Sequence, residues 1–230
     1  MLIRAYSDLH GNLPVIDPCD VLLIAGDLCP IEDWPHDVAE QEAWLRGAFT
    51  DWLKALDAGR IVLTAGNHDF AIEARPERPE LPADLLIDRS IEIDGLKIHG
   101  APWIPTLPDW AFHAEPDELR QKAEAMPDDA QLWMEHCPPY GILDKLWKSG
   151  KHVGNPQIIK AIEQKRPQWF VCGHIHEEAG FATIGDTQIA NIAFVNEFYE
   201  PQFRHLALRF EDGQLIRSEA DETNTHELFN

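Results

Sequence analysis

The chain has 230 residues, enough for one large domain with a sizeable core, and 44% of them are hydrophobic. Its 40 acidic residues outnumber its 19 basic residues, and the resulting formal net charge of −21 argues against non-specific binding to nucleic acid. No apolar run approaches the roughly 18–20 residues that a membrane span requires. Asp8 and His10 already interrupt the first apolar stretch, so we expect neither a membrane anchor nor a cleaved signal peptide.

The first half of the chain alternates predicted strands and helices. Three segments are predicted strands: residues 2–7, 21–25 and 61–65. The last two are short apolar runs, which are typical of strands buried on both faces. Residues 37–58 carry large apolar side chains at helical spacing and are a predicted helix. A stretch with Pro76, Pro79 and Pro82 follows and is predicted to be a loop.

The second half is rich in predicted strands. Asp94-Gly95 joins two alternating segments, and such a two-residue connection is a strong signal for a hairpin. Residues 101–105 are predicted to be irregular. Residues 115–126 and 155–165 are predicted helices, the second capped by Asn155. The predicted strands are residues 90–93, 96–99, 131–135, 168–172, 181–184, 188–192, 205–210 and 214–219.

This order of elements predicts an α/β fold in which two sheets form a β-sandwich flanked by helices. We expect one domain over residues 1–218 and a polar C-terminal tail over residues 219–230. The cysteines at 19, 29, 137 and 172 form no CxxC pair, and a chain of this length does not need disulfides. We therefore expect reduced thiols, with Cys19 and Cys172 buried, and a cytoplasmic location.

Polar side chains follow five of the predicted strands at the point where each strand ends. They are Asp8 and His10; Asp27; Asn67 with His68; His136; and His174 with His176. Ligand sites in open α/β sheets gather at the carboxyl ends of strands. We expect the imidazoles of His174 and His176, two residues apart in extended chain, to point the same way. Each motif alone is also compatible with a polar turn or with surface histidines. Five such motifs in one chain point to a single site.

The types of side chain indicate metal binding. Apart from His68, the set contains seven carboxylate, amide and imidazole groups, too many for one tetrahedral zinc ion, and it lacks the thiolates of a structural zinc site. It fits two divalent ions such as Mn, Fe, Zn or Co. A carboxylate such as Asp27 can bridge two ions through its two oxygens. Ions about 3.5–4 Å apart activate a shared water and hold the attacking and leaving oxygens.

In this combination, the motifs resemble those of the calcineurin-like metallophosphoesterase superfamily: Asp8-x-His10, Gly26-Asp27, Gly66-Asn67-His68-Asp69, His136 and Gly173-His174-x-His176. The resemblance covers residues 2–200 and implies the two-sheet sandwich. Further segments are similar to the metallophosphoesterase-domain phosphodiesterases, a branch linked to hydrolysis of cyclic nucleotides and other phosphodiesters. They are residues 101–105, 109–112, 136–141, 173–177 and 191–193.

The resemblance also implies a role for each site residue. One metal ion would be held by Asp8, His10, Asp27 and His176. The second would be held by Asp27, Asn67, His136 and His174, with Asp27 bridging. His68 would bind no metal and would assist the departure of the leaving oxygen.

One departure from the family pattern concerns His68. Many members carry an aspartate three residues after the bridging one, and this aspartate orients the catalytic histidine. Here Cys29 and Pro30 occupy that region. His68 therefore lacks the usual partner or uses Asp33 or Asp69 instead.

The predicted function is hydrolysis of small-molecule phosphodiesters, with cyclic nucleotides as candidates, by a metal-bridging hydroxide. Asn67, His68 and Trp103 are the predicted substrate-binding residues. Trp103, together with Trp110 and Phe112, offers a face for base stacking, or packs a loop. The alternatives are a phosphoprotein or small-molecule phosphomonoesterase, a nuclease and a non-catalytic metal-binding scaffold. The absence of a basic stripe argues against long nucleic acids, and the complete ligand set argues against a scaffold.

Overall fold

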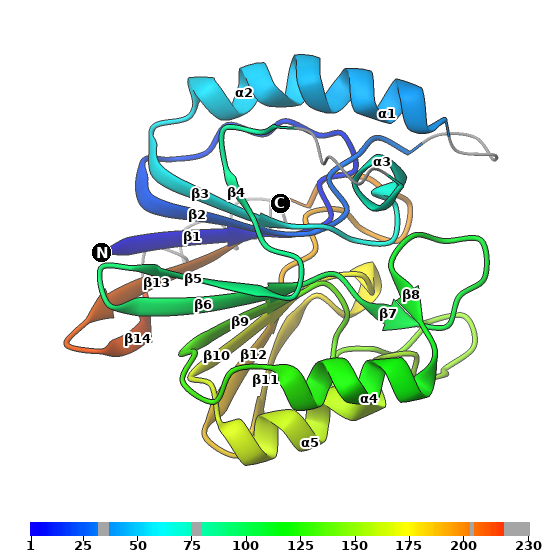
Figure 1. Ribbon diagram of the computed structural model, residues 1–230, viewed down its shortest axis with the longest axis vertical. Coiled ribbons are helices and arrows are strands. Elements are labelled where there is room, and N and C mark those ends of the chain that lie inside the picture. Colours follow the sequence, from blue (N-terminus) through cyan, green and yellow to red (C-terminus); the bar gives the residue numbers. More distant parts are fainter. Residues whose placement is uncertain (32–36, 75–79, 203–204, 219–230) are drawn as a thin grey trace, which may run out of the picture.

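The computed structural model describes residues 1–31, 37–74, 80–202 and 205–218. Two six-stranded sheets lie face to face, and helices cover the outer face of each (Figure 1). This arrangement confirms the predicted α/β sandwich flanked by helices. The predicted tail, residues 219–230, lies outside the described residues, so the domain boundary at residue 218 stays a prediction.

The first sheet has the order β14-β13-β1-β2-β3-β4. Its strands are β1 (Leu2–Tyr6), β2 (Cys19–Ala25), β3 (Ala58–Thr64), β4 (Asp84–Leu85), β13 (Leu206–Glu211) and β14 (Gln214–Arg217). Strands β1 to β4 are parallel, whereas β13 and β14 add an antiparallel hairpin beside β1. The carboxyl ends of β1, β2 and β3 therefore lie at the same edge.

The second sheet has the order β11-β12-β10-β9-β6-β5. Its strands are β5 (Arg89–Ile93), β6 (Leu96–Ala101), β9 (Leu132–Glu135), β10 (Trp169–Cys172), β11 (Gly180–Ile184) and β12 (Thr187–Asn191). Here too the central strands, β6, β9, β10 and β12, run parallel, and an antiparallel strand borders them on each side. A parallel bridge between Ser7 and Ala193 joins the carboxyl ends of the two sheets.

The apolar run of β2 is explained by burial on both faces. Val21 and Leu23 belong to the cluster between the two sheets, whereas Leu22 and Ile24 belong to the cluster under the outer helices. Because successive side chains of a strand point to opposite faces, a strand buried on both sides carries an uninterrupted apolar sequence. This burial fixes the backbone that leads to Asp27.

Helices form the outer layers. The predicted helix over residues 37–58 is observed as α1 (Val38–Trp44), the π-helical turn η1 (Leu45–Phe49) and α2 (Thr50–Ala55), and it lies on the first sheet. It ends before residue 58, which already belongs to β3. Helices α4 (Pro116–Ala125) and α5 (Pro156–Lys165) cover the second sheet. Asn155 caps α5 as predicted, since its Oδ1 accepts the N–H of Gln157 at 3.0 Å.

Several short elements were not predicted. They are α3 (Phe70–Glu73), the 3₁₀ turn η2 (His176–Glu178), β4 and the small pair β7 (Ile104–Pro105) and β8 (His113–Ala114). The interpretation of residues 101–105 as irregular is therefore wrong at both ends, because β6 extends to Ala101 and β7 begins at Ile104. Elements of two to four residues are too short for a hydrophobic period to reveal. Pro76 and Pro79 lie outside the described residues.

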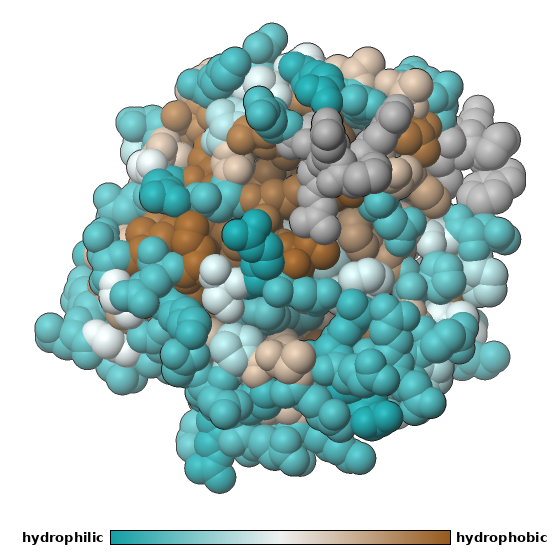
Figure 2. Space-filling view, in the orientation of Figure 1, coloured by the Kyte–Doolittle hydropathy of each residue, from teal (hydrophilic) through white to brown (hydrophobic). Residues whose placement is uncertain are grey.

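The surface, the helices and the cysteines bear on the expectations about membrane anchoring, thiol burial and location. Figure 2 shows mostly hydrophilic side chains over α4 and α5 on the face in view. Within the described ranges, no helix combines the length and the apolar character that a bilayer crossing requires. All four cysteines are free, and Cys172 is buried as expected, whereas Cys19 is only partly buried. The cytoplasmic location stays a prediction.

The buried histidine on β6 predicts a loss of stability in acid. His99 is 6% exposed, and burial lowers its pKa from 6.5 to about 4. The unfolded chain therefore binds a proton at this position more readily than the folded chain as the pH falls from 6.5 to 4. We expect the free energy of unfolding to fall by up to about 1.4 kcal/mol per pH unit in that window. Urea unfolding at several pH values should show the free energy of unfolding falling more steeply in wild type than in His99→Gln, by up to this slope. Parallel pH profiles of the two proteins would contradict the prediction.

Candidate metal centre

The carboxyl ends of the central strands bring all eight predicted site residues together at one edge of the sandwich. Asp8 and His10 follow β1, Asp27 follows β2, Asn67 and His68 follow β3, His136 follows β9, and His174 and His176 follow β10. All are buried apart from His174, which is partly exposed. Backbone hydrogen bonds lock the neighbouring strand ends together, among them Asp8 N–H to Gly26 O and Gly173 N–H to His136 O, both 3.0 Å.

A first cluster consists of Asp8, His10, Asp27 and His176, whose candidate ligand atoms all lie within 4.8 Å of one another. The Nε2 atoms of His10 and His176 are 3.1 Å apart. His176 Nε2 lies 3.2 Å from Asp8 Oδ1, and His10 Nε2 lies 3.6 Å from Asp27 Oδ2. Two imidazoles and two carboxylates therefore converge on one point.

The hydrogen bond on the far side of the His176 ring determines what its inner nitrogen offers. Nδ1 lies 3.1 Å from the carbonyl oxygen of Asn196, which can only accept, so Nδ1 carries the proton. In the neutral ring, Nε2 then presents a lone pair toward Asp8 and His10. A backbone carbonyl that fixes the tautomer in this way is the usual support of a metal-binding histidine.

A second cluster consists of Asp27, His136 and His174, also within 4.8 Å of one another, with Asn67 beside them. His136 Nδ1 lies 2.9 Å from Ala25 O and therefore carries the proton, as in His176. Its Nε2 faces Asn67 Oδ1 at 3.1 Å and Asp27 Oδ2 at 3.4 Å. Two acceptor oxygens and the Nε2 of His136 therefore face one another, and positive charge between them, from a proton or a metal ion, stabilises this arrangement.

Asp27 belongs to both clusters through a single oxygen. Its Oδ2 is 3.6 Å from His10 Nε2 and 3.4 Å from His136 Nε2. Its Oδ1 instead accepts the backbone N–H of His68 at 2.8 Å. The expectation that the two carboxylate oxygens each face one metal is therefore wrong: one oxygen faces both clusters, and the other anchors the carboxylate to the loop after β3.

A proton can supply part of the positive charge that these acceptors require. Burial opposes protonation of His136, but the charge of Asp27 outweighs it and raises the pKa of His136 to about 9. Burial also opposes ionisation of Asp8, but the hydrogen bond and charge of His176 outweigh it and lower the Asp8 pKa to about 2. The carboxylates are therefore ionised near neutral pH, and a metal ion would replace the proton on His136.

The other two rings remain neutral. Burial lowers the pKa values of His10 and His174 to about 3. Neutral imidazoles and ionised carboxylates are the forms that bind metal ions. Each cluster therefore contains at least one imidazole and one carboxylate that are ready to bind without losing a proton.

The backbone at the site adopts sparsely populated conformations. Asp8, His10, Asp27 and His174 have φ values of 55°, 44°, 51° and 67°. Non-glycine residues rarely adopt a positive φ, and such strain concentrates at functional sites. His174 in this conformation and His176 at the start of η2 do not lie in extended chain, so the prediction that their imidazoles point the same way is wrong. Each ring instead joins a different cluster.

Asp69 acts on the backbone rather than on the ring of His68. Its carboxylate accepts the N–H groups of Leu28 and Cys29, each at 2.9 Å, and of Gly66 at 2.8 Å. These bonds tie the loop after β2 to the loop after β3, and so fix Asp27 relative to Asn67. Asp69 is therefore not the partner that orients the His68 ring. Asp33, the other candidate, lies outside the described residues.

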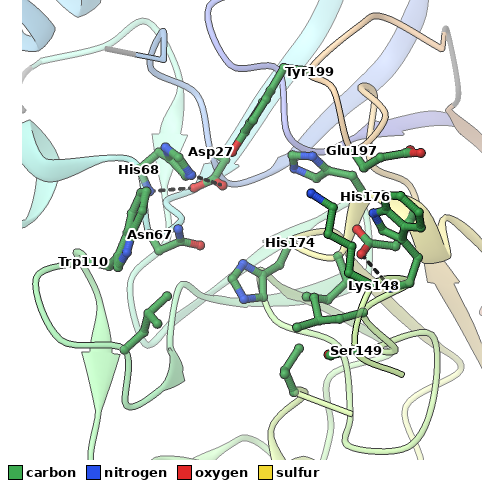
Figure 3. A pocket seen from close by; sticks show the side chains of 16 residues that line it. Asp27, Asn67, His68, Trp110, Lys148, Ser149, His174, His176, Glu197 and Tyr199 are labelled. Atoms are coloured by element: carbon green, nitrogen blue, oxygen red, sulfur yellow. Dashed lines mark hydrogen bonds and ion pairs between the residues drawn. The ribbon is translucent and has the colours of Figure 1, made fainter. Parts of the chain in front are cut away.

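His68 stands at the wall of the cleft, next to Trp110, with ring centroids 4.4 Å apart (Figure 3). Its carbonyl oxygen accepts the side-chain N–H of buried Gln41 at 2.8 Å. His68 Nε2 lies 4.0 Å from Asp27 Oδ2, farther than the nitrogens of His10 and His136. His68 is not a member of either cluster of candidate metal ligands.

The cleft over the two clusters has a volume of about 570 Å³. Its described lining residues are Asp27, Asn67, His68, Leu107, Trp110, Leu146, Trp147, Lys148, Ser149, Val153, His174, Ile175, His176, Glu177, Glu197 and Tyr199. Sequence reasoning missed the contributions of residues 146–149, of Val153 and of Tyr199, because nothing in their spacing marks them. The fold alone brings these loops to the site.

Trp103 does not line this cleft. Its Nε1 donates to Asp88 Oδ1 at 2.8 Å, and the ammonium of Lys122 lies 3.5 Å from its ring centroid. The neighbouring Phe112 is buried against it. The prediction that Trp103 contacts the substrate is therefore corrected: of the three aromatic residues considered, Trp110 faces the cleft and the other two pack the loop.

Comparison with known proteins identifies the family. Residues 1–178 match the model of the family described as calcineurin-like phosphoesterase. Metallophosphoesterase domain-containing protein 1 of Homo sapiens is 27% identical over 225 residues, which cover 85% of this chain and 66% of the human protein. UPF0046 protein T07D4.2 of Caenorhabditis elegans is 27% identical over 227 residues, covering 82% of this chain and 54% of the relative. The chain thus spans about two thirds of the first relative and about half of the second. It belongs to the calcineurin-like phosphoesterase family.

Solved structures share the fold. One crystal structure superposes with a TM-score of 0.65 at 14% identity, covering 94% of this chain and 98% of the other. The crystal structure of TT1561 from Thermus thermophilus superposes with a TM-score of 0.57 at 13% identity, covering 94% and 97%. At such low identity the similarity bears on the fold alone.

A glycine beside the first cluster gives a test of the geometry. A Cβ at Gly173 would overlap Asp8 Oδ2 and Ser7 Oγ. We therefore expect Gly173→Ala to displace the Asp8 carboxylate and lower the manganese bound per chain by at least half, measured by elemental analysis after dialysis. Gly47→Ala is the matched control, because a Cβ there meets nothing within 4 Å. Equal manganese content in both variants would contradict this packing.

Proposed function

We propose that the protein hydrolyses small-molecule phosphodiesters at this centre. Seven side chains would hold two divalent metal ions: Asp8, His10, Asp27 and His176 the first, and Asp27, Asn67, His136 and His174 the second. The observation that carries the proposal is the shared Oδ2 of Asp27, which lies between two groups of buried acceptors. Manganese, iron, zinc and cobalt all suit this mixture of carboxylate, amide and imidazole ligands.

The reaction divides between the metal pair and the protein side chains. Two bound ions would neutralise the phosphate oxygens and make water nucleophilic near neutral pH. His68 would protonate the leaving oxygen or stabilise the charge that develops on it. Trp110 packs against the His68 ring and restricts its rotation. Gln41 and Asp27 hold the His68 backbone through its carbonyl and N–H groups.

The character of the cleft favours diesters with an apolar or aromatic substituent. Leu107 and Trp110 lie on its lining together with Leu146, Trp147 and Val153. A flat group such as the base of a cyclic nucleotide can stack on an exposed aromatic wall, a contact worth roughly 1–3 kcal/mol. Glu177 and Glu197 also line the cleft, and their negative charges oppose a dianionic monoester more than a monoanionic diester. This electrostatic difference argues against a phosphomonoesterase, with either a phosphoprotein or a small-molecule substrate.

Substitutions should separate metal binding from chemistry. We expect Asn67→Ala and His136→Ala to lower both manganese content and hydrolysis of bis(p-nitrophenyl) phosphate. His68→Ala should leave the manganese content near that of the wild type and lower kcat by roughly 10²- to 10⁴-fold.

The experiment compares manganese-loaded protein with the same protein in chelator. Unchanged kcat of His68→Ala on a diester with a poor leaving group would refute the role of His68. Metal-loaded wild type that is inert toward diesters would favour a metal-binding scaffold.

Lys148 is the only lysine or arginine among the described residues that line the cleft. In a chain with a net charge of −21, its ammonium should attract the anionic substrate. Because Lys148 is exposed, we expect Lys148→Gln to raise KM by no more than about fivefold, and added salt should shrink the difference. The control is Lys151→Gln, an exposed lysine outside the lining. Equal KM values for both variants at low ionic strength would contradict this role.

A further inference from the structure

Tyr199 lies over the first cluster of candidate metal ligands, although no motif contains it. Its ring centroid is 5.0 Å from that of His10 and 5.3 Å from that of His176, edge-on to both. The His68 ring is 6.3 Å away. Figure 3 shows the Tyr199 side chain extending into the cleft toward Asp27, from the side opposite to Ser149. The tyrosine therefore faces the same space as His68.

A dense set of hydrogen bonds holds Tyr199 in this position. Asn196 Oδ1 accepts the N–H groups of Phe198 and Glu200, each at 2.9 Å, and Asn196 O accepts the N–H of Tyr199 at 2.9 Å. The carbonyl of Asn196 also faces His176 Nδ1 at 3.1 Å. One residue therefore both orients a candidate metal ligand and forms the turn that presents Tyr199.

The backbone of Tyr199 is strained. Its φ is 62°, a conformation that bulky side chains rarely adopt. Tyr199 is 39% exposed, so burial of its ring in the core does not explain why this conformation is kept. A strained residue that is firmly held beside a reaction centre points to a functional constraint.

With a metal ion bound, the first cluster would offer a phosphate no hydrogen-bond donor. Asp8 and Asp27 are carboxylates, and the Nε2 atoms of His10 and His176 that face them would give their lone pairs to the metal ion. The oxygens of a bound phosphate also accept, so in the metal-loaded protein a donor on this side of the cleft would come from another residue. Among the described side chains that line the cleft, Tyr199 alone combines a hydroxyl group with a ring that packs against this cluster.

We propose that Tyr199 is a further catalytic residue, whose hydroxyl donates a hydrogen bond to a non-bridging oxygen of the substrate phosphate beside the first cluster. The proposal rests on the phosphodiesterase function proposed above. A non-bridging oxygen gains negative charge during attack, so the bond would also stabilise the transition state. It would complement His68, which acts on the leaving oxygen.

The test uses Tyr199→Phe, which keeps the ring and removes the hydroxyl. Two probes are measured on manganese-loaded protein: the Kd of inorganic phosphate, and kcat/KM for aryl methyl phosphodiesters with leaving groups of different acidity. We expect weaker phosphate binding and a loss of kcat/KM of roughly 10- to 100-fold, the factor for one hydrogen bond to a charged group. The loss should be the same for good and poor leaving groups, and manganese content should not change. Tyr140→Phe, an exposed tyrosine outside the cleft lining, is the control.

Three results would overturn the proposal. Unchanged phosphate affinity and kcat/KM would mean that the hydroxyl touches no phosphate oxygen. A loss that grows with the pKa of the leaving group, at unchanged phosphate affinity, would place the contact at the leaving oxygen instead. A fall in manganese content would make Tyr199 a positioning residue for the ligands. Wild type that binds phosphate but hydrolyses no diester would refute the phosphodiesterase function. In that case, the phosphate affinity of Tyr199→Phe would still show whether the Tyr199 hydroxyl contacts a phosphate oxygen.

Discussion

Repulsion between buried acceptors is the constraint on which this centre depends. Oxygens of Asp8, Asp27 and Asn67 face the Nε2 atoms of His136 and His176 at 3.1–3.4 Å, in a region closed to most solvent. Acceptors this close are stable only if positive charge lies between them. Protons on the histidines meet this requirement in part, and two divalent ions meet it more completely, since each can accept several lone pairs at once.

The fold supplies the rigidity that such an arrangement requires. Parallel strands from two sheets end at one edge, and the bridge between Ser7 and Ala193 holds the two edges together. Asp69 ties the loops after β2 and β3, while the carbonyls of Ala25 and Asn196 fix the tautomers of His136 and His176. Groups behind the candidate ligands therefore determine which atoms face the candidate metal positions. Strain at Asp8 and Asp27 is tolerated because these bonds over-determine the backbone.

Sequence reasoning succeeded where the signal is local. The strand that leads to Asp27 is a continuous apolar run, and the polar residue that ends it marks the edge of the sheet, so the convergence of the site residues could be predicted. The orientation of individual side chains could not. Trp103 and Trp110 belong to one aromatic segment, and only the contacts of Trp103 with Asp88 and Lys122 turn it away from the cleft. Tyr199 depends on a turn built around Asn196, which no periodic pattern reveals.

We propose that one oxygen of Asp27 joins two metal positions, and crystals grown with manganese test this proposal most directly. Anomalous scattering measured at the manganese edge locates each ion independently of the protein geometry. The account predicts two peaks per chain, one among Asp8, His10 and His176 and the other among Asn67, His136 and His174, with Asp27 Oδ2 in contact with both. A single peak, or two peaks of which one lies away from Asp27, would contradict it.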